Sequence, residues 1–193
     1  MEFQVKMRLN KTKLYQKDNA ILWYFPRAFA DYQIDDFNSL PWQQNSIRVF
    51  GKEYLEPRLT CYFGPKYTYS SVSWPARELA EELIPMQNKL FEQVGFLSNA
   101  VLCNYYRSGV DSMGWHADNE KEIDQQIIAS VSFGATRKME FRHIQTKERF
   151  GVELHHGDLL IMENFQNSWQ HAIFKKKVSA PRINLTFRRI ITH

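Results

Sequence analysis

The sequence predicts an α+β fold in which a double-sheet jelly roll carries a few helices packed on one side. Short segments of β-favouring residues, separated by Gly and Pro, recur along the chain and dominate its second half. Apolar residues at helical spacing are confined to the first half. The chain has 193 residues, of which 44% are hydrophobic, so it is long enough for one core that needs no disulfide bridges.

The first half combines short strands with two helical segments. The apolar run Ile21–Phe25, which Pro26 follows, predicts the first strand, and Ala30–Leu40 predicts a helix before Pro41. Further strands are expected at residues 47–50, 58–63 and 67–69.

A second helix is expected to begin at Ser73-Trp74-Pro75 and to end at Gly95. We expect Pro85 to break or kink it, because proline removes a backbone hydrogen bond. Its apolar residues recur at helical spacing: Leu79, Leu83, Met86, Leu90 and Val94.

The second half reads as a succession of strands with turns at Gly109, Gly134, Gly157 and Pro181. The expected strands are residues 100–104, 127–133, 138–142, 149–154, 158–162, 170–174 and 183–190. Many short strands at regular spacing are typical of sandwiches and jelly rolls.

Composition excludes several classes of protein. No apolar run approaches the roughly 20 residues that span a bilayer, and residues 1–19 contain no apolar signal-peptide core. Two cysteines, Cys61 and Cys103, are too few for a disulfide framework and suit a reducing compartment. We therefore expect an intracellular protein with no membrane partner, and the pI near 9.0 favours a polyanionic one.

One group of residues has the pattern of a metal site. His116 and Asp118 lie two residues apart, so on an extended segment both side chains face the same way, and His171 lies on a separate expected strand. Two imidazoles and one carboxylate form the facial triad that non-haem Fe(II) oxygenases use. Taken alone, His-x-Asp is also compatible with a surface turn.

Polar residues on two expected strands indicate an anionic ligand. Arg182 and Arg188 are six residues apart, an even separation that puts them on one face of a strand. Two arginines that face inward need an anion such as a dicarboxylate, whereas a solvated basic edge explains either one alone. Asn104 and Tyr106 share a face and can bond the same anion, or simply end a half-buried strand.

Several motifs occur together in the order and spacing of one family. From about Phe50 to the C-terminus the chain resembles the AlkB family of Fe(II)/2-oxoglutarate-dependent nucleic-acid dealkylases, and most closely the second and third human homologues and their bacterial relatives. The motifs are Asn104-x-Tyr106, Gly109-x-Asp111, Trp115-His116-x-Asp118-x-Glu120, residues 129–134, Phe141-Arg142-His143, residues 157–162, His171, and Arg182 through Arg188.

The resemblance implies a role for each of these polar residues. His116, Asp118 and His171 would bind Fe(II), and Arg182 would pair with the distal carboxylate of 2-oxoglutarate. Arg188 would lie near the chelating end of 2-oxoglutarate and orient Asp118, while Asn104 and Tyr106 would complete the pocket. With O₂, the family demethylates N1-methyladenine and N3-methylcytosine in DNA and releases formaldehyde, succinate and CO₂.

The resemblance also implies contacts with nucleic acid. Tyr67 and Tyr69 would line the pocket of a base flipped out of the duplex, and Glu120 would accept a hydrogen bond from its exocyclic amine. Phe50, in Val49-Phe50-Gly51-Lys52, would wedge into the stack, which favours double-stranded DNA. The ordinary alternatives are a core aromatic for Tyr69, a solvated acid for Glu120 and a buried hairpin residue for Phe50.

Positive residues would add contacts to phosphates, which are independent of base sequence. The residues expected to supply this charge are Arg58, Arg137, Lys138, Arg142, Arg149 and Lys175-Lys176-Lys177. The alternative is that the lysine run 175–177 is exposed to solvent and binds nothing.

On this interpretation residues 1–193 form a single AlkB-like dioxygenase domain with a double-stranded β-helix core. Residues 1–20 would be an N-terminal extension, 45–74 a nucleotide-recognition hairpin region, and 98–193 the catalytic jelly-roll core. We expect a monomer that acts on alkylated, double-stranded DNA inside the cell, in the cytoplasm (nucleoid) if the source is bacterial.

Three alternatives stay open on sequence alone. The same chemistry could act on RNA or single-stranded DNA. A non-catalytic module could bind lesions without turnover. A zinc hydrolase could use the same three ligands, although Arg182 and Arg188 have no obvious task there.

Overall fold

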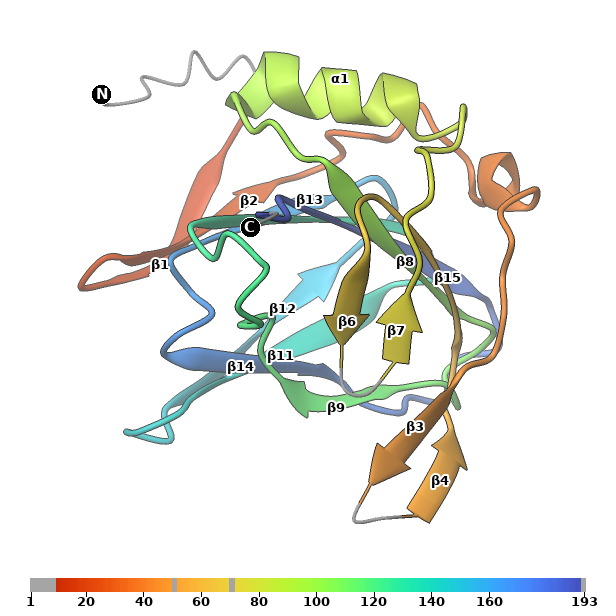
Figure 1. Ribbon diagram of the computed structural model, residues 1–193. Coiled ribbons are helices and arrows are strands. Elements are labelled where there is room, and N and C mark those ends of the chain that lie inside the picture. Colours follow the sequence, from red (N-terminus) through yellow and green to blue (C-terminus); the bar gives the residue numbers. More distant parts are fainter. Residues whose placement is uncertain (1–9, 50–51, 70–71, 192–193) are drawn as a thin grey trace.

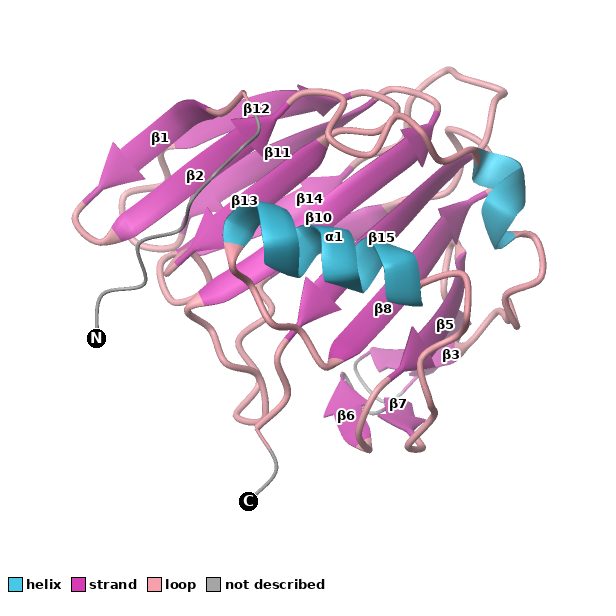
Figure 2. Cartoon of the chain, turned by 90° about the horizontal axis from the view of Figure 1, so that it is seen from above, coloured by secondary structure: helices cyan, strands magenta, loops and turns pink. Residues whose placement is uncertain are grey.

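The computed structural model describes residues 10–49, 52–69 and 72–191. Two antiparallel sheets face each other, and one α-helix covers the outer face of the larger sheet (Figures 1 and 2). The expected jelly-roll architecture, mostly β with few helices, is confirmed.

The larger sheet has seven strands in the order β1-β2-β13-β10-β15-β8-β5. They are β1 (Thr12–Lys17), β2 (Ala20–Phe25), β13 (Leu159–Glu163), β10 (Ile127–Gly134), β15 (Arg182–Arg188), β8 (Ala100–Tyr106) and β5 (Leu59–Phe63). The expected strand at 21–25 corresponds to β2, whereas β1 was not predicted. Nearly all of β1 is exposed at the sheet edge, so its sequence lacks the apolar alternation that marks a half-buried strand.

The smaller sheet has four strands in the order β12-β11-β14-β9. They are β12 (Arg149–Leu154), β11 (Arg137–His143), β14 (Trp169–Ile173) and β9 (Met113–His116). The short strand β9 was not predicted, since it has four residues and contains Gly114. Its pairing with β14 sets His116 directly opposite His171.

Two hairpins fall within residues 45–74 and pair β3 (Ser46–Val49) with β4 (Lys52–Leu55), and β6 (Tyr67–Tyr69) with β7 (Val72–Trp74). The helix expected to start at Ser73-Trp74-Pro75 is therefore wrong. Trp74 ends a strand as the cross-strand partner of Tyr67, and its own side chain is buried. Pro75 follows the strand and cannot extend its hydrogen bonding.

Helix α1 (Ile84–Val94) begins ten residues later than expected. Pro85 lies in its first turn, where a missing N–H costs nothing, so the expected break at Pro85 is also wrong. The expected end at Gly95 is confirmed, because Gly95 takes the left-handed conformation with φ 70° and its N–H bonds the carbonyl of Phe91.

The helix expected over Ala30–Leu40 is reduced to one 3-10 turn, Ile34–Phe37 (η1). The turn begins with a capping box, a contact typical of a helix N-terminus. Asp36 accepts from the backbone N–H of Gln33, and the Asn38 amide donates to Asp35.

Two apolar clusters lie on the two faces of the larger sheet. One contains the buried residues of α1 together with Cys103 and Leu185, and the other, between the sheets, contains Leu102, Tyr106 and Phe141. Because side chains alternate along a strand, every second residue of β8 and β15 points into the space between the sheets. Among the described residues, no helix has the length and apolar character needed to cross a bilayer.

Candidate metal centre

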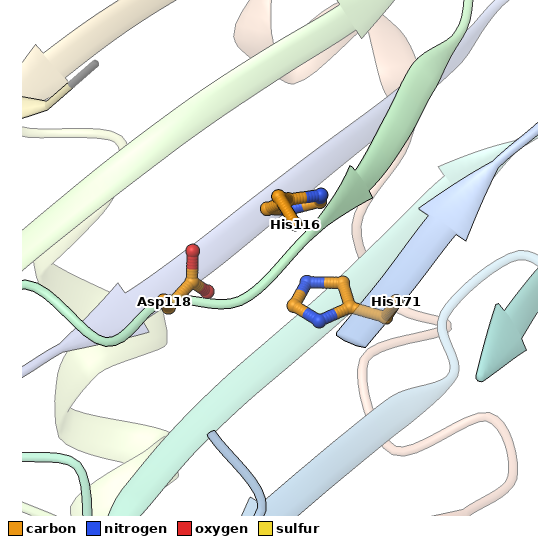
Figure 3. A group of neighbouring side chains, drawn as sticks. All are labelled: His116, Asp118 and His171. Carbon is orange, nitrogen blue, oxygen red and sulfur yellow. The ribbon is translucent and has the colours of Figure 1, made fainter. Parts of the chain in front are cut away.

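Three side chains expected to bind a metal converge between the two sheets (Figure 3). His116 ends β9, Asp118 follows in the next loop, and His171 comes from β14. One ligand atom from each of the three lies within 4.8 Å of the others, and the imidazole centroids are 4.1 Å apart. The spacing on the chain and the β9–β14 pairing together create this group.

Both imidazoles are in the state that a metal requires. Burial lowers the pKa of His171 to about 3, and burial also lowers the pKa of His116, so both rings are neutral at neutral pH. Nδ1 of His116 lies 2.9 Å from the carbonyl oxygen of Gly114. A carbonyl can only accept, so Nδ1 carries the proton and Nε2 keeps its lone pair for a ligand bond.

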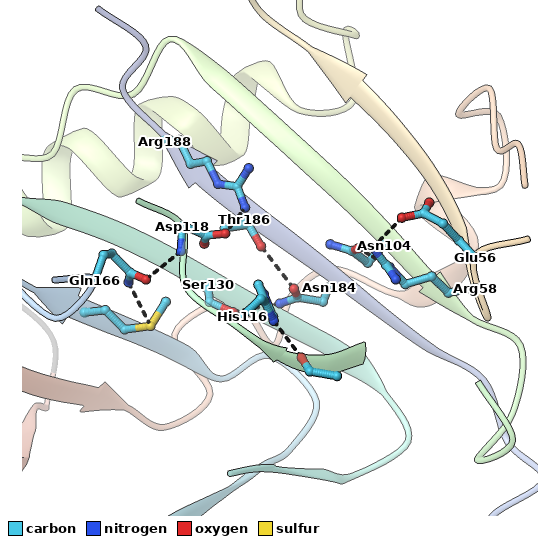
Figure 4. Close-up of polar contacts among 12 residues, drawn as sticks. Glu56, Arg58, Asn104, His116, Asp118, Ser130, Gln166, Asn184, Thr186 and Arg188 are labelled. Atoms are coloured by element: carbon cyan, nitrogen blue, oxygen red, sulfur yellow. Dashed lines mark hydrogen bonds and ion pairs between the residues drawn. The ribbon is translucent and has the colours of Figure 1, made fainter. Parts of the chain in front are cut away.

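Asp118 is held from two sides (Figure 4). Arg188 Nη2 lies 2.6 Å from Asp118 Oδ1, and the backbone N–H of Asp118 donates to Gln166 Oε1 at 2.9 Å. Burial alone would raise the pKa of Asp118, but the charge of Arg188 outweighs burial and lowers it. Oδ2 is buried with no hydrogen-bond partner among the described residues, so one carboxylate oxygen is left for a cation.

A small cavity of about 30 Å³, partly open to solvent, adjoins these ligands. Its lining includes Asn104, Tyr106 and Arg188, which were predicted to lie together, and His116, Asp118 and His171. Three further polar side chains of the lining were not predicted as site residues: Ser130, Asn184 and Thr186. Gln166, which accepts from the backbone of Asp118, was not predicted either.

Strand parity in the sequence could have identified two of these unpredicted residues. Asn184 and Thr186 lie at even separations from Arg182 and Arg188, so all four share one face of β15. Asn184 donates to Ser130 Oγ at 2.7 Å and accepts from Thr186 at 3.1 Å. Gln166 lies in a loop, and no pattern pointed to it.

Arg182 is a cation buried at 1% exposure. Its Nη2 donates to Ser132 Oγ at 2.9 Å, and its guanidinium lies 5.2 Å from the centroid of the Tyr106 ring. Burial lowers its pKa to about 10, so it stays charged at neutral pH. None of the ion pairs formed by the described residues includes Arg182. A buried cation of this kind needs an anion from outside the chain.

The donor set fits iron with a dicarboxylate. Two neutral imidazoles and one ionised carboxylate with a free oxygen are the facial set of non-haem Fe(II) sites. The unpaired charge of Arg182 and the amide of Asn104 suit the carboxylates of 2-oxoglutarate. His116, Asp118 and His171 would hold the metal, which supplies O₂ activation when bound.

The residues expected to contact a base lie partly beyond the described chain. Phe50 lies outside the described residues, and only the backbone of Tyr67 and Tyr69, on β6, is described. Glu120 is half-buried, two residues after Asp118. The roles of these four residues stay predictions.

The structure corrects two of the expected phosphate contacts. Arg58 is buried beside Glu56, and Arg137 is buried with its guanidinium on the backbone carbonyls of Ser108, Asp111 and Phe174. Neither guanidinium is therefore exposed for contact with a phosphate. A count of basic residues cannot distinguish these from surface charges.

Arg142 is half-buried on the outer face of the smaller sheet. Its guanidinium lies 4.5 Å from the Trp115 ring centroid and donates to Gln170 at 2.7 Å. Lys138, Arg149 and Lys175–Lys177 are exposed, as a phosphate contact requires.

Sequence comparisons agree with this geometry. The family model described as the 2OG-Fe(II) oxygenase superfamily matches residues 23–188. The protein named Alpha-ketoglutarate-dependent dioxygenase alkB homolog 3 is 40% identical over 165 residues in Bos taurus and 38% identical over 176 residues in Homo sapiens. The DNA oxidative demethylase ALKBH2 of Mus musculus is 37% identical over 159 residues.

These matches cover 78%, 83% and 75% of this chain, and 58%, 62% and 66% of the respective relatives. The chain thus spans less than two thirds of the length of these proteins. In a comparison of structures, "The structure of OsALKBH1" superposes with a TM-score of 0.63 at 14% identity, covering 92% of this chain and 100% of that one. At this identity the match supports the fold alone.

Proposed function

Because the chain belongs to the AlkB family of the 2OG-Fe(II) oxygenase superfamily, we propose that it is an iron- and 2-oxoglutarate-dependent dioxygenase that removes alkyl groups from DNA bases. The observation that carries this proposal is that β15 presents two buried arginines on one face: Arg188, which holds the metal ligand Asp118, and Arg182, which forms no ion pair with the described residues. A zinc hydrolase would use the three ligands but would have no task for Arg182.

Within this proposal the chain's residues have distinct roles at the metal. The imidazoles of His116 and His171 and the free oxygen of Asp118 would hold the ion. Gly114 fixes the tautomer of His116, and Arg188 and Gln166 hold Asp118 in place. Such supporting contacts orient the ligands and set their affinity for the metal.

The cosubstrate site lies along β15 and β8. Arg182 would bind the distal carboxylate of 2-oxoglutarate with Tyr106 beside it, and Asn104 would donate to the same molecule. Arg188 would lie near the end that chelates the metal. Arg182, Arg188 and Asp118 are themselves buried, so their charged contacts are stronger than they would be in water.

The proposed substrate is alkylated, double-stranded DNA, with N1-methyladenine and N3-methylcytosine as the lesions. Support comes from the relatives named DNA oxidative demethylase and from residues 45–74, which hold the two hairpins. Phe50 would replace the flipped nucleotide, Tyr67 and Tyr69 would contact the base, and Glu120 would accept from its amine. Arg142 and the exposed lysines would bind phosphates. The monomeric state and the intracellular, cytoplasmic location stay predictions.

The proposal is tested by incubating the chain with Fe(II), ascorbate, 2-oxoglutarate and O₂ together with methylated oligonucleotides. Duplex DNA, single-stranded DNA and RNA of one sequence are compared for loss of the methyl group and release of formaldehyde and succinate. We expect demethylation that requires both Fe(II) and 2-oxoglutarate, fastest on the duplex.

Each alternative has its own outcome in that assay. Lesion binding without succinate release would support a binding module. Activity that needs zinc and ignores 2-oxoglutarate would support a hydrolase, and faster turnover of RNA or single strands would change the substrate.

A further inference from the structure

A buried ion pair joins the base of the β3–β4 hairpin to the wall of the cavity. Arg58 and Glu56 are 3% and 4% exposed, and Arg58 Nη2 lies 2.9 Å from Glu56 Oε1 (Figure 4). The second guanidinium donor, Arg58 Nε, bonds Asn104 Oδ1 at 2.8 Å. The pair therefore ends on a side chain that lines the cavity beside the metal ligands.

This contact decides which way the Asn104 amide faces. An asparagine carries one acceptor oxygen and one donor NH₂ group on a nearly symmetric amide, so hydrogen bonding has to select its orientation. A guanidinium can only donate, so Arg58 requires Oδ1 on its own side. Nδ2 is then left on the other side, as a donor to a ligand oxygen.

Glu56 is itself held firmly. Its Oε2 accepts from Thr60 Oγ1 at 3.1 Å, its backbone N–H donates to the carbonyl of Asn45, and its own carbonyl accepts from Gln44. Thr60 pairs directly with Asn104 across β5 and β8. The carboxylate is thus fixed before any ligand arrives, and it fixes the guanidinium in turn.

Stability alone is a weak reason for this arrangement, because burying two charges costs about as much as their attraction returns. We propose that Glu56 and Arg58 are positioning residues that hold the Asn104 amide with its NH₂ group toward 2-oxoglutarate. The proposal rests on the proposed function, because it names what two further residues do for its cosubstrate.

The test uses the full chain loaded with Mn(II), which binds the same ligands without turnover. The dissociation constant of 2-oxoglutarate is measured by titration calorimetry for the wild type, Arg58→Lys, Asn104→Ala and the double variant. Lysine keeps a positive charge for Glu56 but has no nitrogen at the Nε position that bonds Asn104. Thermal unfolding of each variant is recorded in parallel.

We expect Arg58→Lys to weaken binding about tenfold, the worth of one well-placed hydrogen bond. In the Asn104→Ala background the same change should weaken 2-oxoglutarate binding by less than about twofold, because Arg58 acts through Asn104. Equal losses in both backgrounds, or no loss in either, would overturn the inference.

Lys89→Met is the matched control, since it also removes one partner of an ion pair, with Asp31, but on α1 away from the cavity. Its affinity for 2-oxoglutarate should equal that of the wild type. If the wild type itself fails to bind 2-oxoglutarate, the proposed function fails. If the wild type binds and Arg58→Lys binds equally well, only the positioning role fails.

A second variant covers the case in which Arg58→Lys does not fold. Glu56→Gln keeps an acceptor for Arg58 Nη2, and it removes the charge that fixes the guanidinium together with the acceptor for Thr60 Oγ1. We expect a smaller loss of affinity, again abolished in the Asn104→Ala background, and a loss that persists there would contradict the proposal.

Discussion

Arg188 donates to Asp118 across 2.6 Å, and the two side chains are 3% and 1% exposed. A cation from the last strand of the larger sheet thereby holds the one carboxylate of the metal-ligand group, which leaves Oδ2 for the ion. Charge-assisted bonds of this kind are among the strongest that side chains form.

Arg188→Met should weaken metal binding about 10- to 100-fold, because Asp118 loses a buried bond to a charged donor worth about 1.5–3 kcal/mol. Titration of Mn(II) into the apoprotein measures the affinity. Arg189→Met, at the exposed next position, is the control and should bind as the wild type does. Equal affinities in the two variants would refute the role of Arg188.

His116→Ala should abolish metal-dependent demethylation, because one of three ligand atoms is lost from the group. Bound iron is quantified together with formaldehyde release. His155→Ala, at a position outside that group, should leave both unchanged. Full activity in His116→Ala would show that His116 is not a ligand.

Arg182→Ala should raise the KM for 2-oxoglutarate by about 100-fold, since a paired guanidinium gives roughly 1.5–3 kcal/mol to a carboxylate. Arg182→Lys should recover part of the loss, because a point charge remains without the bidentate geometry. The measurement is succinate release at varied 2-oxoglutarate. An unchanged KM in Arg182→Ala would remove Arg182 from the cosubstrate site.

Asp111→Asn should make the free energy of unfolding depend less on pH in the acid range. Burial alone would raise the pKa of Asp111, but its bonds to the side chain and backbone N–H of Arg107 outweigh burial and lower it. A carboxyl whose folded pKa is lowered stabilises the fold above its unfolded pKa, near 4, and loses that effect as the pH falls through the folded value.

The free energy of unfolding in urea should therefore differ between wild type and Asp111→Asn by about 1–2 kcal/mol at pH 7 and converge toward pH 2. Asp31→Asn, at an exposed ion pair, should change stability by less than about 0.5 kcal/mol at every pH. A difference at position 111 that does not shrink with acid would contradict the assignment.

Phe50→Ala should slow repair of duplex DNA more than repair of single strands, because only the duplex needs a wedge to fill the space of a flipped base. The ratio of initial demethylation rates on the two substrates is the measurement. Phe91→Ala, at an exposed position on α1, should leave that ratio unchanged. Equal losses on both substrates would place Phe50 in a structural role.

The sequence predicted those parts of the site that depend on strand parity and on short spacing. Arg182 and Arg188 face inward together because their separation is even, and the His116–Asp118 spacing brings both side chains to His171. Strand parity alone could not show that these residues lie close together in the fold. The resemblance to a known family then assigned a chemistry to them.

Other features depended on contacts that no local pattern encodes. Gln166 reaches Asp118 from a loop 48 residues away, and Arg58 looked like surface charge because its burial depends on Glu56 and Asn104. The helix expected at Trp74 failed for a similar reason, since pairing with Tyr67 outweighs a local helix-start signal.

Strand β15 carries both Arg182 and Arg188 and is paired along its length with β8 and β10. A slip of this strand by a single residue would turn both guanidinium groups to the opposite face at once. The anion site and the support of the metal ligand therefore form together or not at all. A chain that closed its sheet in the wrong register would therefore lose the guanidinium for the anion and the support of Asp118 together.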